Sequence, residues 1–367
     1  MFEIIKLNKL ELSIYIKSER FLNAPVLPIS EHRALSQIKN PKALKDDVLL
    51  LLTYDNEKLI GYLGILPDDI FLNETQSIHC GWMSCLWVDP NYRGKKIAQN
   101  LIHACFESWK GNILLTEYTG PAEMLYIKMG LFTSFKEMKG VRYYVRSDLS
   151  TLLPPKRIIF DKIKPILKSL DWGINILIDT ISYFRNPLSL NYSAEEINKI
   201  DSETNNFISP LLVNQNFKRS ENELNWIMQN PWVLSSDIAD EKAKKYHFTS
   251  TSRKFEITAL KIRNQKSEML GFIILTNRDG HLKIPYCFYI GNIDAIQEVV
   301  NNFIKENKIK TVSIYQPSII EIQKRKPFIK AINKSITRKY LISTSLSKKV
   351  NINNIVLQDG DGDCAFT

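Results

Sequence analysis

A short basic loop is the part of this sequence whose residue types and spacing best suggest a chemistry. It follows an apolar run that ends at Val88, and it is made of Asp89, Pro90, Asn91, Tyr92, Arg93, Gly94, Lys95 and Lys96. Pro90 removes a strand donor and fixes a turn, and a helical pattern begins at Ile97. The free N–H groups at a helix start bind anions, and a glycine lets the main chain approach them closely. The loop therefore predicts a site for a pyrophosphate-sized ligand. The alternative, to which the physical argument gives equal weight, is a basic strand-turn-helix that binds no ligand.

Cysteine and aspartate spacing gives no sign of a metal site or a disulfide framework. The cysteines are five in number, with no Cys-x-x-Cys pair. Cys80 and Cys85 share one predicted strand, and a covalent acyl-cysteine would need an activating partner that the sequence does not identify, so both are interpreted as packing residues. Residues 358–363 alternate Asp with Gly as a calcium loop does, but they lack its distal glutamate. No metal is expected.

The elements that must position this loop are predicted from apolar periodicity. In the first half we expect strands at 2–7, 48–54, 59–66, 76–88, 113–118 and 135–146, and helices within 10–38, 97–109 and 121–129. In the second half we expect helices to about 229, then strands at 255–263, 269–276, 282–289, 311–315 and 340–345, with helices at 293–305 and 319–325. Both halves follow one order of elements, which predicts a duplicated α/β architecture with a mixed sheet.

A basic amphipathic stretch, 156–187, lies between the two halves. It carries six Lys/Arg against three Asp, and its Ile and Leu residues recur near the helical period. We expect two helices that meet near Gly173. They either form a linker packed between two domains or lie on the surface of an anionic bilayer, with Trp172, Tyr183 and Phe184 at the interface.

Composition bounds the class of protein. The 367 residues are 44% hydrophobic and 24% charged, which is typical of a globular chain of about two domains. The longest run without a charged residue is 75–88, shorter than the roughly 18 residues of a spanning helix, and the N-terminus lacks a secretory signal. We expect a cytoplasmic protein, with contact at the inner face of the membrane left open. The net charge of +10 suits a phosphate-rich ligand or an anionic surface, and no nucleic-acid-binding module accompanies it.

Two blocks of the first half resemble signatures of the GNAT superfamily of N-acetyltransferases. The segment from Tyr92 to Ala98 is similar to the Arg/Gln-x-x-Gly-x-Gly/Ala motif that wraps the pyrophosphate of acetyl-CoA. The segment from Ala122 to Leu131 is similar to the second block of that family, Ala-x-x-Phe/Leu-Tyr before Gly-Phe. Departures are Lys96 at the second glycine, Thr119 at a common asparagine, and Leu131 at the usual phenylalanine.

The resemblance implies acetyl-CoA as cosubstrate and a set of residues that hold it. These are Leu86, Trp87, Val88, Arg93, Gly94, Lys95, Lys96, Ile97 and Ala98. The fourth and fifth strands would splay, so that the pantetheine arm pairs with main-chain groups of Leu86 and Val88, while an N–H near Val88 polarises the thioester carbonyl.

The resemblance also implies how protons would move. Tyr126 matches the general acid that protonates the departing thiolate, with a packing aromatic as the alternative. For removal of the acceptor proton, Glu117 is the first candidate and His79 the second, and either could instead be a surface residue.

The expected organisation is a tandem of GNAT-like acyl-CoA N-acyltransferase folds. It comprises an acetyl-CoA-binding domain at 1–149, a helical linker at 150–190, a degenerate GNAT-like domain at 191–350 without a counterpart of the basic loop, and a tail at 351–367. Residues 217–232 resemble two-domain acetyltransferases of bacterial surface-polysaccharide or cell-envelope synthesis. The expected reaction is direct acetyl transfer to a small-molecule amine, an amino sugar or envelope precursor being preferred. A non-catalytic binding protein or membrane-peripheral scaffold is the alternative, and a homodimer is left open.

Overall fold

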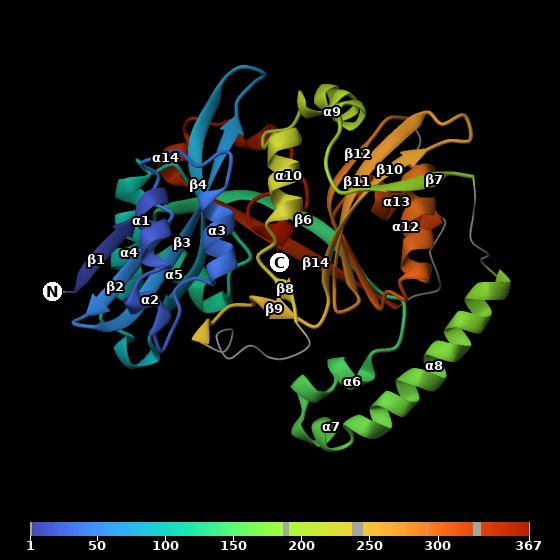
Figure 1. The fold of residues 1–367 in the computed structure, drawn as a ribbon, viewed down its shortest axis with the longest axis horizontal. Helices are drawn as coiled ribbons and strands as arrows, with labels where there is room; N and C mark the ends of the chain where they lie inside the picture. The colour runs from blue at the N-terminus through green and yellow to red at the C-terminus, as the bar shows by residue number, and fades with distance from the viewer. Residues whose placement is uncertain (1, 186–190, 237–244, 292, 326–331, 367) are drawn as a thin grey trace. The chain divides into compact units, whose positions relative to one another are not determined.

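The computed structural model describes residues 2–185, 191–236, 245–291, 293–325 and 332–366 (Figure 1). It forms two compact units, each built from segments distant in the sequence. Unit 1 consists of Met1–Met138, Asn198–Ile257 and Thr337–Thr367, and unit 2 consists of Lys139–Ile197 and Thr258–Ile336. The division predicted from sequence, 1–149 and 191–350, remains a prediction about sequence domains. The compact units divide the chain differently, because 198–257 and 337–367 belong to unit 1.

The sheet of unit 1 contains the strand followed by the basic loop. Its strand order is β1 (Glu3–Leu7), β2 (Leu50–Asp55), β3 (Lys58–Phe71), β4 (Ser77–Val88), β5 (Ile113–Thr116) and β14 (Ile332–Ser343). The first four strands pair antiparallel, β4 pairs with β5 in parallel, and β14 pairs with β5 antiparallel. Strands β2 and β3 read as nearly continuous apolar runs, as expected for strands buried on both faces.

Helices of unit 1 cover both faces of this sheet. They are α1 (Lys9–Tyr15), α2 (Glu19–Leu22), α3 (Glu31–Ile38), α4 (Ile97–Ser108), α5 (Gly120–Met129), α9 (Ser202–Ile208) and α10 (Glu221–Gln229). Neighbouring residues of β3 show the two faces, since Tyr62 packs with Leu12 of α1 whereas Leu63 packs with Leu101 of α4. Asn8 and Ser30 cap α1 and α3 by accepting main-chain hydrogen bonds.

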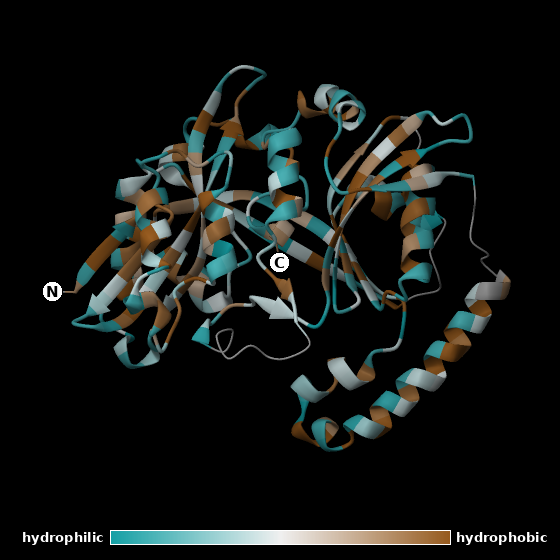
Figure 2. Cartoon of the chain, in the orientation of Figure 1, coloured by the Kyte–Doolittle hydropathy of each residue, from teal (hydrophilic) through white to brown (hydrophobic). Residues whose placement is uncertain are grey.

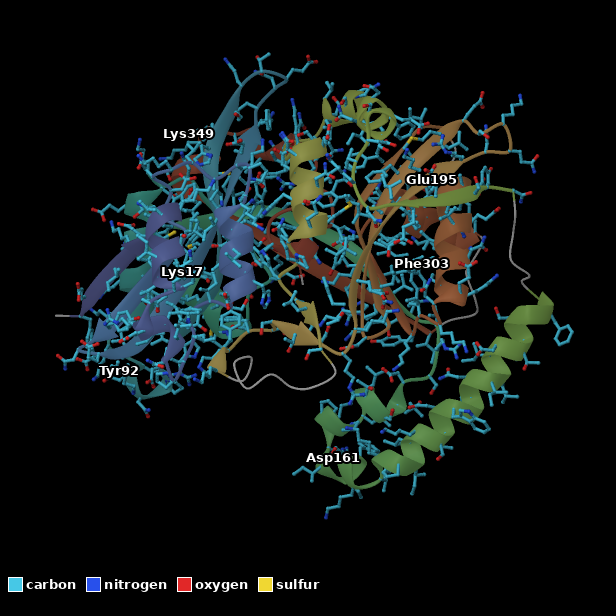
Figure 3. The ribbon with its side chains drawn as sticks, viewed as in Figure 1. Lys17, Tyr92, Asp161, Glu195, Phe303 and Lys349 are labelled. Atoms are coloured by element: carbon cyan, nitrogen blue, oxygen red, sulfur yellow. The ribbon has the colours of Figure 1, made fainter. Side chains whose placement is uncertain are left out.

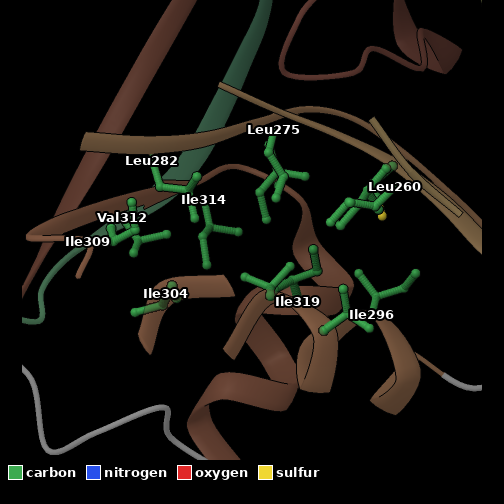
Figure 4. Packing of buried hydrophobic residues seen from close by; sticks show 14 of the residues in the cluster. Leu260, Leu275, Leu282, Ile296, Ile304, Ile309, Val312, Ile314 and Ile319 are labelled. Carbon is green, nitrogen blue, oxygen red and sulfur yellow. The ribbon is translucent and has the colours of Figure 1, made fainter. Parts of the chain in front are cut away.

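Unit 2 repeats the same order of elements. Its strands follow the order β6 (Phe132–Tyr144), β13 (Thr311–Ile314), β12 (His281–Tyr289), β11 (Met269–Arg278), β10 (Phe255–Arg263) and β7 (Ser193–Ile197). Helices α12 (Asp294–Glu306) and α13 (Pro317–Arg325) pack on this sheet through a core that includes Leu275, Ile296 and Ile314 (Figure 4). The unit also holds α6 (Leu149–Leu152), α7 (Ile158–Lys162) and α8 (Lys164–Arg185).

The final strands of the two repeats are exchanged. β6 follows β5 and α5 in the chain, yet its residues 141–144 pair with β13. β14 follows β13 and α13, yet its residues 340–342 pair with β5. The predicted tandem α/β architecture is confirmed, and this exchange is a feature that element order alone does not reveal.

Among the described elements that differ from the sequence-based expectation are β7, β14 and α8. β7 forms where helices were expected, and β14 begins at Ile332, eight residues before the predicted strand. α8 runs unbroken through Gly173, because a glycine costs a helix only about 1 kcal/mol and leaves its hydrogen bonds intact. The break lies at Ile163 instead, just before α8 begins. Pro165 is tolerated in the first turn of α8 because the N–H group that proline lacks would have no partner within the helix there.

Candidate active site

Strands β4 and β5 separate after a short paired stretch. Their described ladder joins Gly81–Met83 to Ile113–Leu115, and β4 then continues to Val88 paired with β3. Cys85 has a φ of 57° and lies at a register shift against β3, which is the geometry of a β-bulge. The bulge turns Leu86 to Val88 away from β5, so the main chain there lies at a sheet edge that could pair with an extended ligand.

The basic loop after β4 opens onto an uncapped helix. Pro90–Tyr92 form a single 3₁₀ turn, held by a hydrogen bond from Asn91 N to Asp89 Oδ1 of 2.9 Å. No side chain caps α4, and its first turn contains no acidic residue. Since the first N–H groups of a helix have no partner within it, they are available to a ligand. The start of α4 thus fits an anion.

Side chains of the loop leave this helix start open. Arg93, Gly94, Lys95 and Lys96 are all exposed, and a Cβ added at Gly94, whose φ is 85°, would meet no atom within 4 Å. Lys95 Nζ lies 4.4 Å from the centre of the Tyr92 ring, and the Tyr92 hydroxyl donates to Asp55 at 2.8 Å. Figure 3 labels Tyr92 in unit 1. The residues predicted to hold a pyrophosphate therefore form an accessible, positively charged surface.

Tyr126, on α5, lies inside the core that α4 and α5 share. It is 5% exposed and packs edge-on against Tyr118 and Phe132. Burial raises the pKa of the Tyr126 hydroxyl, and the nearby Cys105 and Tyr118 add to the effect. The phenol is protonated at neutral pH with or without this rise, and the rise makes it a weaker acid.

Glu117 is tied into an ion pair. It ends β5 with a φ of 49°, and its Oε1 accepts from Arg338 Nε at 2.8 Å. Arg338, on β14, also donates to the main-chain oxygen of Asp359 at 2.7 Å. A Glu117 carboxylate that compensates a buried guanidinium is poorly placed to take up a proton.

His79 is held between two carboxylates. Its Nδ1 lies 2.8 Å from Asp69 Oδ1 and its Nε2 lies 2.9 Å from Asp47 Oδ2. Burial disfavours the charged ring, but hydrogen bonds to Asp47 and Asp69 outweigh it and raise the pKa of His79 to about 9. The ring is therefore charged at neutral pH with both nitrogens engaged, which suits an ion-pair network better than a general base.

The C-terminal residues form a structural part of unit 1 that the sequence analysis treated only as a tail. Residues 357–362 and 364–366 are buried, and Phe366 stacks on Trp232 with ring centres 4.4 Å apart. Thr367 lies outside the described residues. The apolar Cys-Ala-Phe sequence at 364–366 is the one signal that could have suggested burial.

Each aspartate of the Asp-Gly repeat is bound by the fold. Asp359 forms an ion pair with Arg338, and Asp361 Oδ1 lies 3.3 Å from Arg219 Nη2. Asp363 accepts a hydrogen bond from Ser84 Oγ on β4. The repeat is thus anchored by side chains from β14, from the segment before α10 and from β4. These partners, Arg338, Arg219 and Ser84, lie far apart in the sequence and form no motif from which the contacts could be predicted.

The Asp363 carboxylate lies beside the bulge of β4. Ser84 also accepts from Arg33 Nη2 at 3.0 Å, and Arg33 Nη1 contacts the sulfur of Cys85. Burial raises the pKa of Asp363, although the Ser84 hydrogen bond and the Arg33 charge oppose the rise. A carboxylate with a raised pKa accepts a proton more readily near neutral pH than an ordinary aspartate does. Asp363 and Arg33 are candidate site residues that sequence reasoning missed.

Unit 2 has the same strand geometry without the basic loop. The described ladder of β12 with β13 covers only His281–Lys283 and Thr311–Ser313. The first turn of α12 carries Asp294, a carboxylate that would repel a phosphate. The described residues of unit 2 therefore offer no match to the start of α4.

The described residues contain neither a metal-binding cluster nor a helix that could span a membrane. Across residues 2–366 with the gaps stated above, no group of three or more His, Cys, Asp or Glu could hold a metal ion. In the same part of the chain, no helix is both long and apolar enough to span a bilayer.

Comparisons with known proteins agree with this architecture. Residues 16–130, less than half of the chain, match the model of the Acetyltransferase (GNAT) family. A search of curated proteins finds no significant match.

Two solved structures share the fold. A probable N-acyltransferase from Enterococcus faecalis V583 aligns with a TM-score of 0.52 at 10% identity, over 94% of this chain and 73% of its own. A GCN5-related N-acetyltransferase from Anabaena variabilis ATCC 29413 aligns with a TM-score of 0.51 at 13% identity, over 93% and 72%. At such identities the likeness is one of fold. The relation to cell-envelope enzymes remains a prediction.

Proposed function

We propose that this protein transfers an acyl group, acetyl in the simplest case, from acyl-CoA to a small-molecule amine. The observation that carries the proposal is the open start of α4, which is uncapped, basic and placed directly after the separation of β4 from β5. A likeness of fold alone would not specify a function, so the proposal depends on this site. Acetyl-CoA would supply an activated thioester there.

Donor binding would use the main chain more than side chains. The amides of Ile97 and Ala98 face a diphosphate at the positive end of α4, and Arg93, Lys95 and Lys96 add charge around it. Leu86 and Val88 present strand groups on the free side of β4, and Trp87 packs between Tyr62 and His247 on the opposite face of unit 1. All nine residues predicted for the cosubstrate thus lie on one continuous stretch of strand, loop and helix.

Acyl transfer would proceed by direct attack. The amine nitrogen forms the C–N bond, and a main-chain N–H near Val88 donates to the oxygen on which negative charge develops. The C–S bond then breaks, and Tyr126 gives its proton to the departing thiolate. Glu117 and His79 were the sequence candidates for base, but each is engaged in ion pairs.

Asp363 is the carboxylate that we assign to remove the amine proton. It lies next to β4 at Ser84, one residue before the bulge that redirects the strand toward the basic loop. Because the pKa of Asp363 is raised, its carboxylate takes up a proton near neutral pH more readily than an exposed aspartate would. An amino sugar or envelope precursor remains the preferred acceptor, supported by the resemblance of 217–232 alone.

The test is release of free CoA thiol from acetyl-CoA in the presence of amino sugars, amino acids or polyamines. We expect thiol release that depends on one amine class and is lost in Arg93→Glu. Absence of amine-dependent release across the panel, while acetyl-CoA still binds, would favour a non-catalytic binding protein.

A further inference from the structure

α8 exposes an apolar stripe along its length. Five side chains recur every three or four residues and therefore share one helix face: Ile166, Leu170, Ile174, Leu177 and Ile181. All are exposed, and Leu177 retains 64% of its accessible surface. Brown and teal segments alternate along α8 in Figure 2, as an amphipathic helix requires. Of the predicted interfacial residues, Trp172 and Phe184 are exposed, while the side chain of Tyr183 lies outside the described residues.

The face of α8 that packs on the protein carries the polar residues Asp171 and Asn175 beside the buried Leu167. Asp171 is buried and accepts hydrogen bonds from Ser147 Oγ at 2.6 Å and from the N–H groups of Leu149 and Ser150 at 2.7 and 2.9 Å. Asn175 bonds the main chain of Ser147 in the same way. A helix of a globular protein normally packs its apolar face inward. In α8 the hydrogen bonds of Asp171 and Asn175 fix the orientation of the helix, and the apolar stripe is left outside.

Positive charge lies near this apolar surface along the chain. Five basic residues with described, exposed side chains lie in or next to α7 and α8: Lys156, Arg157, Lys162, Lys164 and Lys168. Two of the three aspartates are engaged internally, Asp171 as above and Asp179 with Arg146. Ile158 and Ile159 of α7 are also exposed. Net positive charge beside exposed apolar side chains complements an anionic lipid surface.

We propose that α7 and α8 bind the surface of an anionic bilayer, with the apolar stripe at the acyl boundary and the lysines among the headgroups. A second copy of this chain is a less suitable occupant, because two equally basic surfaces would repel each other. α8 is not apolar enough to span the bilayer, so it would lie along the surface. This inference is independent of the acyl-transfer chemistry.

The test is flotation of the full chain with phosphatidylcholine vesicles that contain or lack phosphatidylglycerol. We expect the protein to float with the anionic vesicles only, and less at high salt. Ile181→Glu should lower the ratio of vesicle-bound to free protein about tenfold. The variant loses an apolar side chain that would be buried in the bilayer and puts a negative charge in its place.

A matched control is Ile290→Glu, in the same unit. Ile290 is 54% exposed and Ile181 is 53% exposed, so both variants make the same change at equal exposure. Ile290→Glu should float as wild type does. The inference would be overturned if both variants lost flotation equally, if wild type floated equally with neutral vesicles, or if wild type did not float at all. It would also be overturned if the chain formed a dimer that Ile181→Glu abolished. CoA-thiol release measured without lipid should be unchanged in Ile181→Glu, which separates this inference from the proposed reaction.

Discussion

Ser84, on β4 where that strand leaves β5, donates a hydrogen bond to the carboxylate of Asp363, 279 residues further along the chain. The contact places a C-terminal aspartate beside the bulge that precedes the basic loop. It also explains why the Asp-Gly repeat is buried: each of its carboxylates is bound by the fold. The C-terminal residues are therefore expected to take part in the site as well as in the stability of unit 1.

Asp363→Asn should slow acyl transfer by about a hundredfold, because an amide cannot take up the amine proton. Turnover of wild type should rise with pH through the pKa of Asp363, which lies above its ordinary value, and this dependence should vanish in the variant. The measurement is the pH profile of CoA-thiol release. Asp361→Asn, the same change two residues away, should retain the profile. An unchanged profile in Asp363→Asn would show that another group is the base.

Asp361→Asn should instead change how stability depends on pH. Burial raises the pKa of Asp361 to about 7, with Asp68 adding to the rise and Arg219 opposing it. Since the folded state holds this proton more tightly, its contribution is present at low pH and is lost as pH rises from about 4 through 7. Urea unfolding should show that the variant lacks this loss. A parallel fall of wild type and variant would place the titrating group elsewhere.

Tyr126→Phe should lower turnover by about a hundredfold and leave acetyl-CoA affinity nearly unchanged, because only the proton donor is removed. Phenylalanine fits the same buried space, so the midpoint of thermal unfolding is the control for packing. Loss of affinity in step with turnover would assign Tyr126 to the core alone.

His79→Gln should remove a pH-dependent part of stability. The pKa of His79 is raised to about 9, so the charged ring contributes fully below about 6.5 and the contribution is lost as pH rises through 9. Unfolding free energies measured across this window should fall in wild type and stay flatter in the variant. Catalysis should persist in His79→Gln, and its abolition in a folded variant would restore His79 as a candidate base.

Sequence reasoning reached most elements of unit 1 because their signals are local. Pro90 ends β4, Gly94 lies in the loop, and Gly130, with a φ of 66°, ends α5 where predicted. The nine cosubstrate residues could be proposed for the same reason, since all lie within the short segment 86–98.

What the sequence could not supply depends on contacts across long separations. The exchange of β6 and β14 changes no local pattern, since each strand keeps its alternation whichever neighbour it pairs with. Arg33, Ser84 and Asp363 come together only through the fold. Glu117 and His79 are ionisable residues at plausible positions, but the partners that engage them, Arg338 and Asp47, lie far away in the sequence.

Titration calorimetry of acetyl-CoA tests the central claim most directly, because the claim is that the start of α4 binds a diphosphate. Wild type should bind, and Arg93→Glu should weaken binding at least about tenfold, or ~1.4 kcal/mol. Lys110→Glu makes the same charge reversal just beyond the other end of α4, about 18 Å along the helix, and should bind as wild type does. Failure of wild type to bind, or equal weakening by both variants, would contradict the account.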